Sequence, residues 1–209
     1  MKRNRVIAGA MALVCAFCLA ACAAPPEAAP SGTPSANAQP SAGASASPQT
    51  PAASPEASQP AAGSMEAVRE AIHGVLKADG VQGGIAESEY ADGAFPGYAV
   101  QNLPEGMEEI PPSALQADGM ESGLYIQALM NVRSDLIYVI RATDEEAAKT
   151  IEEQLKEVLA GQEETWKQYL PDQYEKVQNT ILKREGTLVY YITYDNPEAV
   201  EQAILGAAK

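Results

Sequence analysis

One long stretch of this chain cannot contribute to a folded core, which limits the fold to the remaining residues. Between residues 23 and 64 there is no Val, Ile, Leu, Met, Phe, Tyr or Trp, and the only charged residues are Glu27 and Glu56. The rest is mainly Ala, Pro, Ser, Gly, Gln and Thr. Such a segment cannot bury enough apolar surface to offset the conformational entropy that ordering costs. We therefore predict a disordered Ala/Pro/Ser-rich tether within 22–64 and a single folded domain in 65–209.

Residues 1–21 have the parts of a bacterial secretion signal. Lys2, Arg3 and Arg5 give a positive start, and residues 6–19 form an uncharged apolar run, shorter than the ~20 residues that a transmembrane helix needs. The following Leu19-Ala20-Ala21-Cys22 resembles the lipobox of bacterial lipoproteins, in which the cysteine thiol receives a diacylglyceryl group and becomes the new N-terminus. We predict lipidation at Cys22. The alternative is an ordinary secretory leader that is cut after an Ala-x-Ala site and leaves Cys22 as a free thiol.

A lipidated Cys22 makes the membrane a partner through the anchor, on its outer face, with the folded domain outside the cytoplasm. Two acyl chains hold a protein stably on a bilayer, whereas one holds it only marginally. Cys15 and Cys18 have C-x-x-C spacing, but they lie inside the leader that processing removes. The mature chain then has one cysteine and no intramolecular disulfide, so its stability must come from a packed core.

The charge balance excludes one class of partner. The chain has 14 Lys and Arg against 28 Asp and Glu, for a formal net charge of −14. A protein that binds nucleic acid needs a basic face to neutralise phosphates. We therefore expect no nucleic-acid partner.

The pattern from residue 65 onward predicts an α+β domain. Apolar residues at helical spacing behind Ser64, which suits the N-cap position, predict a helix over 65–77. The segment 80–123 is rich in Gly and Pro and predicts only an irregular crossing with a short strand or helix. The remaining pattern predicts strands over 124–132 and 136–142, a helix from the capping box Thr143-Asp144-Glu145-Glu146 to Pro171, strands over 177–184 and 187–194, and a helix after Asn196-Pro197.

These elements form two ββα units in succession. Two such units can merge into one four-stranded antiparallel sheet with the helices on one face, so we predict a two-layer α+β sandwich with an additional N-terminal helix. Residues 136–147 and 188–199 also match in residue character. This match indicates either a duplicated ββα unit or two strand-to-helix junctions with the same cap chemistry, and the sequence does not distinguish the two.

Several segments resemble a known family. The resemblance rests on the lipobox, the tether, the first helix, Thr165-Trp166-Lys167-Gln168-Tyr169-Leu170-Pro171, Val177-Gln178-Asn179-Thr180-Ile181 and the strand over 187–194. Together they are similar to a Gram-positive lipoprotein family catalogued as domain of unknown function 4358, over residues 65–205. Because that family has no assigned activity, catalytic residue or ligand, the resemblance implies a cellular location and related folds and supplies no mechanism.

Groups that can carry catalysis are scarce. His73 is the only histidine, and a surface position on the first helix accounts for it. Without a second histidine or a spare cysteine the usual zinc sites cannot form, so we expect no metal, no cofactor and no assigned catalytic residue. Carboxylates remain, because an acidic pair alone can hydrolyse glycosidic bonds. The glutamates of the second helix, however, lie opposite its apolar stripe, as on a solvated face: Glu145, Glu146, Glu152, Glu153, Glu157, Glu163 and Glu164.

Four aromatic residues are candidate binding residues. Trp166, Tyr169 and Tyr174 lie close together in the sequence around Pro171. They either pack in the core or line a groove for a sugar, a peptide or a peptidoglycan stem. Tyr191 shares its side of a strand with Val189, and we expect it on the open face of the sheet.

These features favour a non-catalytic surface lipoprotein whose tethered domain binds an envelope protein or a cell-wall or extracellular ligand. The alternative is a hydrolase that acts on cell-wall glycan through two carboxylates, and whether any catalysis takes place stays open. A solute-binding lipoprotein is disfavoured, because such proteins usually need two lobes around a cleft and 65–209 is short for this arrangement.

Overall fold

The computed structural model describes residues 60–209. The predicted leader, Cys22 and the predicted tether up to residue 59 lie outside the described residues. The elements follow in the order α1 (Met65–Gln82), η1 (Glu87–Gly93), β1 (Tyr98–Leu103), η2 (Glu105–Glu109), β2 (Met120–Ala128), β3 (Leu136–Ala142), α2 (Glu145–Tyr169), α3 (Pro171–Gln178), β4 (Ile181–Glu185), β5 (Leu188–Thr193) and α4 (Pro197–Ala207). None of the helices in 60–209 is long and apolar enough to cross a membrane.

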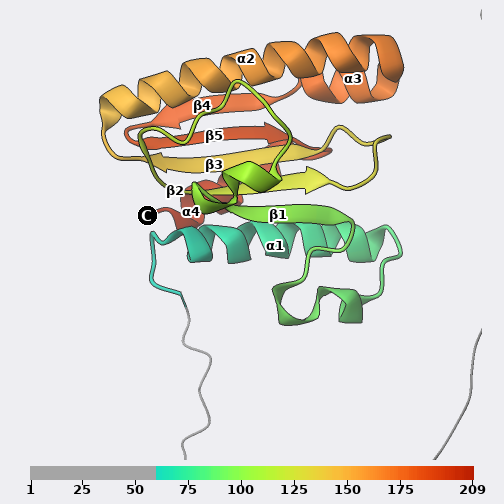
Figure 1. Ribbon diagram of the computed structural model, residues 1–209. Coiled ribbons are helices and arrows are strands. Elements are labelled where there is room, and N and C mark those ends of the chain that lie inside the picture. The colour runs from blue at the N-terminus through green and yellow to red at the C-terminus, as the bar shows by residue number, and fades with distance from the viewer. Residues whose placement is uncertain (1–59) are drawn as a thin grey trace, which may run out of the picture. The chain divides into compact units, whose positions relative to one another are not determined.

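Five strands form one antiparallel sheet in the order β1-β2-β3-β5-β4 (Figure 1). The prediction of four strands is wrong, because β1 pairs with β2 along its whole length, from Tyr98 opposite Ala128 to Leu103 opposite Gly123. β1 lies within the Gly- and Pro-rich segment 80–123. Its sequence signal is weak because its side chains do not alternate between buried and exposed positions.

Helices cover both faces of the sheet, so the predicted two-layer sandwich with helices on one face is also wrong. α2 packs on one face, and α1 and α4 pack together on the other (Figure 1). Along β3, Tyr138 and Ile140 belong to the core under α2, whereas Ile137 and Val139 belong to the core under α1 and α4. The physical reason is that β3 and β5 carry continuous apolar runs, and both faces of such strands must be covered.

The matching segments 136–147 and 188–199 are not equivalent in space. Tyr138 packs under α2, whereas its counterpart Tyr190 packs under α1 and α4 on the opposite face. The two segments share their cap chemistry, because the side chains of Asp144 and Asn196 accept hydrogen bonds from the third backbone N–H beyond them, at 2.8 and 3.4 Å. The cap of α2 is therefore Asp144, one residue after the predicted Thr143.

Helix boundaries follow the local signals in part. α1 begins at Met65, where the Ser64 side chain accepts a hydrogen bond from the Ala67 N–H at 3.1 Å, as predicted. The strand expected over 177–184 begins only at Ile181, because the short helix α3 comes first. Pro171 opens α3 at its first turn, where a missing N–H costs nothing.

The N-terminal segment and the β2–β3 loop (129–135) lie at opposite ends of the sheet (Figure 1). The Gly63 N–H donates to the Ala207 carbonyl at 2.9 Å, and the Arg141 guanidinium donates to the Gly63 carbonyl at 2.9 Å. Arg141 is near the end of β3, whereas the β2–β3 loop leads into its start. At a rise of ~3.3 Å per residue, β3 separates the two ends by roughly 20 Å.

Candidate functional site

The β2–β3 loop turns apolar side chains toward solvent. Leu129 is 68% exposed, Met130 58% and Val132 43%, and Tyr169 at the end of α2 is 52% exposed. The strand predicted over 124–132 ends at Ala128, which is why these loop residues leave the core. The Leu129 N–H donates to the Gly97 carbonyl at 2.9 Å, so the loop is tied to the segment before β1.

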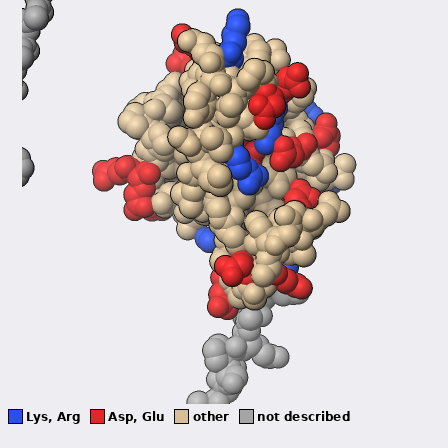
Figure 2. Space-filling view, turned by 90° about the vertical axis from the view of Figure 1, so that its right-hand side faces the viewer, with Lys and Arg blue, Asp and Glu red and all other residues tan. Residues whose placement is uncertain are grey.

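A groove of about 460 Å³ joins this loop to the last turns of α2. Residues 127–131 line one side, and Gln162, Thr165, Trp166 and Tyr169 line the other. The indole N–H of Trp166 donates to Gln162 Oε1 at 2.9 Å, and the Trp166 and Tyr169 rings lie 5.8 Å apart between centroids. We call Leu129, Met130, Val132, Trp166 and Tyr169 the loop-end surface. Figure 2 looks at this end of the domain and shows a broad area without charged side chains, with both acidic and basic groups around it.

The structure brings together two of the four predicted binding residues. Trp166 and Tyr169 lie in the groove, with Trp166 mostly buried and Tyr169 exposed at its edge. Tyr174 belongs to α3 and lines a different hollow, together with Glu163 and Lys167. The predicted cluster of three aromatics around Pro171 is therefore divided between two sites.

Tyr191 lies far from solvent. It is fully buried in the core under α2, so the expectation of an open sheet face at this position is wrong. Tyr191 stands opposite Tyr138 on the neighbouring strand, with their ring centroids 5.9 Å apart. Burial raises the pKa of the Tyr191 hydroxyl. Its position is that of a core residue, because α2 covers the face that the prediction left open.

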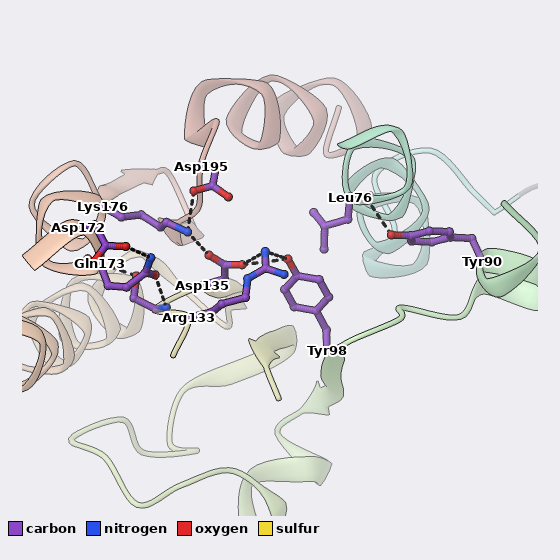
Figure 3. A network of polar contacts seen from close by, with 10 residues as sticks. Leu76, Tyr90, Tyr98, Arg133, Asp135, Asp172, Gln173, Lys176 and Asp195 are labelled. Carbon is purple, nitrogen blue, oxygen red and sulfur yellow. Dashed lines mark hydrogen bonds and ion pairs between the residues drawn. The ribbon is translucent and has the colours of Figure 1, made fainter. Parts of the chain in front are cut away.

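Directly behind the exposed loop, Asp135 is buried among cations (Figure 3). Its side chain is 1% exposed, Lys176 Nζ lies 2.7 Å from its Oδ1, and Arg133 Nη2 contacts its Oδ2. The Tyr98 hydroxyl donates to Oδ2 at 3.0 Å, and Lys176 also lies 2.7 Å from Asp195 Oδ1. A buried carboxylate is costly unless it is paired and hydrogen-bonded, and Asp135 meets both conditions.

This cluster ties the loop to β1 and α3. The Ser134 N–H donates to Gln173 Oε1 at 2.9 Å, which links the loop to α3. Burial, and next the charge of Asp135, raise the pKa of Tyr98, so its phenol stays a hydrogen-bond donor. The Arg133 guanidinium lies over the Tyr98 ring, with its Cζ 5.4 Å from the ring centroid. The loop that exposes the apolar residues is thus held in place from behind.

A cavity of about 270 Å³ lies on the other side of Arg133. Its walls come from the end of α1, from η1, from the start of β1 and from the segment after β5. We call it the Tyr90 cavity; its polar and aromatic lining residues are Asp79, Tyr90, Tyr98, Arg133, Tyr194 and Asp195. Arg133 therefore borders both the groove and this cavity.

Residues 114–194 match the family model described as Domain of unknown function (DUF4358). This confirms the predicted match to domain of unknown function 4358, over a shorter segment than the expected 65–205. The matched segment contains β2, β3, α2, α3, β4 and β5, and with them Asp135, Lys176 and the whole loop-end surface. It does not contain α1, β1 or α4. No curated protein and no solved structure matches the chain.

Within and beside the matched segment, other residues considered for chemistry have structural contacts. Glu152 binds Lys156 at 3.0 Å and Arg184 at 2.9 Å, and these two partners lower its pKa. His73 is half-buried, with its Nε2 2.9 Å from the Ala94 carbonyl oxygen. The predicted solvated face of α2 is exposed at Glu145, Glu146, Glu153, Glu157 and Glu164. Residues 60–209 contain no group of three or more His, Cys, Asp or Glu side chains placed to hold a metal ion.

Sequence reasoning missed Asp135 and its partners. Asp135 lies between the strands predicted over 124–132 and 136–142, in a turn where a polar residue is ordinary. Tyr98 and Lys176 are 37 and 41 positions away, so no local pattern connects them to it. The apolar character of Leu129, Met130 and Val132 gave no warning either, because it placed them within the strand predicted over 124–132.

Proposed function

We propose that this protein is a lipid-anchored, extracytoplasmic module that binds an envelope protein through the loop-end surface. The observation that carries the proposal is the exposure of Leu129 and Met130 in one groove with Trp166 and Tyr169, with Val132 exposed in the same loop. Contiguous exposed apolar patches are uncommon on soluble domains and are typical of interaction sites. Trp, Tyr and Met are also enriched at the centres of protein interfaces.

The way the loop is held supports binding as its role. Burial of an exposed Leu or Met side chain contributes about 1.5–3 kcal/mol, and the fold forgoes most of this contribution at Leu129 and Met130. The Asp135 cluster and the hydrogen bond to Gly97 instead keep the loop in one conformation. A surface that is ordered before binding loses less conformational entropy when a partner arrives.

The position of the surface suits an anchored protein. Leu19-Ala20-Ala21-Cys22 supports a lipid anchor of the kind found in Gram-positive lipoproteins, and the composition of 23–64 supports a spacer between anchor and domain. Gly63 meets the domain at Arg141, at the opposite end of β3 from the loop. The loop-end surface therefore faces away from the point where the N-terminal segment joins.

We expect the partner to offer apolar side chains flanked by basic ones. The chain has a net charge of −14, and acidic groups are among the charged side chains around the uncharged area in Figure 2. Opposite charges at the rim of an interface speed association and disfavour acidic competitors. An envelope protein with an apolar segment between Lys or Arg residues meets both requirements.

The test introduces a photo-cross-linking amino acid at Met130 of the full-length protein in its native cells. The matched control carries the same amino acid at Gln202, an exposed position of α4. We expect one protein to be trapped from position 130 and not from position 202. That protein is then purified and titrated against this chain, with the fluorescence of Trp166, the only tryptophan, as the readout.

The titration is repeated with two variants. Met130→Asp should weaken binding at least tenfold, which corresponds to about 1.4 kcal/mol. Gln202→Asp should leave the affinity unchanged. Equal trapping from both positions, or equal affinities of both variants, would overturn the proposal. A cross-link between two copies of this chain would make the surface a dimer contact instead.

Two further experiments address the other parts of the proposal. Radiolabelled palmitate should enter the protein, and Cys22→Ser should move the protein out of the membrane fraction; unchanged fractionation would refute the anchor. The purified protein is also incubated with cell-wall preparations. If it releases soluble glycan, and a single Asp or Glu replacement abolishes this release, the protein is the alternative hydrolase and not a binding module.

A further inference from the structure

The Tyr90 cavity lies on the other side of Arg133 from the groove of the loop-end surface and has a different chemistry. We propose that the Tyr90 cavity binds a small organic ammonium ion. Its aromatic walls, the charges that line it and its size support this assignment.

Three tyrosines form the aromatic part of the wall. Tyr90 and Tyr194 are buried and Tyr98 is half-buried. Burial is the main cause that raises the pKa of all three, so their rings are uncharged π-systems. One of them already holds a cation, because the Arg133 Cζ lies 5.4 Å from the centroid of the Tyr98 ring. Neutral aromatic walls of this kind bind organic ammonium ions by cation–π attraction.

The charges around the cavity favour a cation over an anion. Arg133 is paired with Asp135, and Asp195 is paired with Lys176. Asp79 also lines the cavity, and none of the ion pairs formed within residues 60–209 includes it. In and beside the cavity there are thus three carboxylates and two cations. The carboxylates are those of Asp79, Asp135 and Asp195, and the cations are Arg133 and Lys176. An entering anion would meet the charges of Asp79 and Asp195, whereas an ammonium ion would be attracted by them.

The shape of the cavity fits a small ligand. Its volume of about 270 Å³ is just below that of sites for drug-sized molecules. Gly80 makes room for the wall, because a Cβ there would lie 1.7 Å from the Tyr90 hydroxyl oxygen. That hydroxyl donates to the Leu76 carbonyl at 3.4 Å, as Figure 3 shows, and this bond fixes the ring. Asp195 is two-thirds exposed at the border of the cavity, which leaves a way in from solvent.

The test is a calorimetric titration of the full chain with choline as the probe. Neohexyl alcohol, in which a carbon replaces the charged nitrogen of choline, is the matched ligand. We expect saturable binding of one choline per chain and at least tenfold weaker binding of the alcohol. Asp79→Asn should weaken choline binding at least tenfold. Asp118→Asn, an exposed acid next to the start of α2, should leave it unchanged.

The aromatic contribution is tested at Tyr90. Tyr90→Phe keeps the ring and should retain choline binding within about threefold, whereas Tyr90→Leu removes the ring and should weaken it at least tenfold. Thermal unfolding shows whether each variant is folded. If Tyr90→Leu does not fold, the effect of Asp79→Asn on choline binding tests the inference instead. Met130→Asp should leave choline binding unchanged, so this inference and the proposed function fail independently.

Three outcomes would overturn the inference. Equal affinity for choline and the alcohol would show an apolar cavity without charge recognition. Saturable binding of acetate in place of choline would make Arg133 the centre of an anion site. Absence of saturable choline binding in the folded wild-type chain would refute the inference outright.

Discussion

The two hairpin connections of the sheet lie at its opposite ends and differ in what they expose. Residues 186–187 alone join β4 to β5, with Gly186 at φ 60° and the exposed Glu185 beside it. Residues 129–135 join β2 to β3, and this loop exposes Leu129 and Met130 while it buries Asp135. The first connection has the length and polarity that chain reversal requires. The second has charge inside and apolar groups outside, which supports a role in binding rather than in chain reversal.

The largest expected effect concerns the buried charge of the longer connection. Asp135→Asn should lower the free energy of unfolding by about 3–5 kcal/mol, because Arg133 and Lys176 lose the carboxylate between them. Urea unfolding followed by Trp166 fluorescence measures the change. The matched control is Glu185→Gln in the shorter connection, which should change it by less than about 0.5 kcal/mol. A loss below about 1 kcal/mol for Asp135→Asn would show that the cluster contributes little to stability.

The tyrosines near the longer connection predict a loss of stability at alkaline pH. Burial raises the pKa of Tyr98 and Tyr194 above the ordinary value of 10. Above pH ~10 the unfolded chain releases these phenol protons, whereas the folded chain keeps them. The free energy of unfolding is therefore highest below pH ~10 and falls as the pH rises toward the pKa values of the folded state. The urea midpoint should therefore be lower at pH 11 than at pH 8. Tyr98→Phe should reduce the difference, and an unchanged midpoint would contradict the prediction.

Substitution of Gly186 in the shorter connection should change the free energy of unfolding only through the backbone conformation of that residue. A Cβ at Gly186 meets no other atom, so Gly186→Ala costs only the left-handed conformation, about 1 kcal/mol. Gly161 lies inside α2, also with open space around a Cβ, and Gly161→Ala should stabilise the domain by about 0.5–1 kcal/mol. Urea unfolding of the two variants should thus give changes of opposite sign. A Gly186→Ala variant as stable as the wild type would contradict the expected cost of the left-handed conformation, and a destabilising Gly161→Ala would contradict the helix-propensity gain.

The smallest expected effect is at the exposed residues of the longer connection. Leu129→Ser and Met130→Ser should each change the free energy of unfolding by less than about 0.5 kcal/mol, because solvent already surrounds both side chains. The same urea titration checks this. Val139→Ala in the centre of β3 is the buried comparison and should cost at least ~1 kcal/mol. A comparable loss at Met130 would indicate that the loop is needed for folding.

The sequence predicted the elements whose signals are local. Ser64 caps α1, and the strands β3 and β5 lie where apolar runs predicted them, whereas β2 begins and ends four residues before the predicted 124–132. The short strand or helix expected within 80–123 could not be placed at β1, and the helix α3 was missed, because neither has a marked pattern of buried and exposed positions. The continuous apolar runs of β3 and β5 already indicated that both sheet faces are covered, but the prediction placed the helices on one face only.

The candidate site was predictable to a smaller extent. Trp166 and Tyr169 were found because they lie on adjacent turns of one helix. Asp135 and Tyr98 were not found, because they meet only after β1 has paired with β2 and the loop has docked on α3.

The amino-acid order alone determined the cap of α1, the positions of β3 and β5 and the turn at Gly186, because these depend on interactions between residues a few positions apart. The tertiary structure decided which sheet face each helix covers, that Asp135 is buried between Arg133 and Lys176, and that Leu129 and Met130 remain outside. Burial is set by whatever packs against a residue from distant parts of the chain, and no local pattern contains that information.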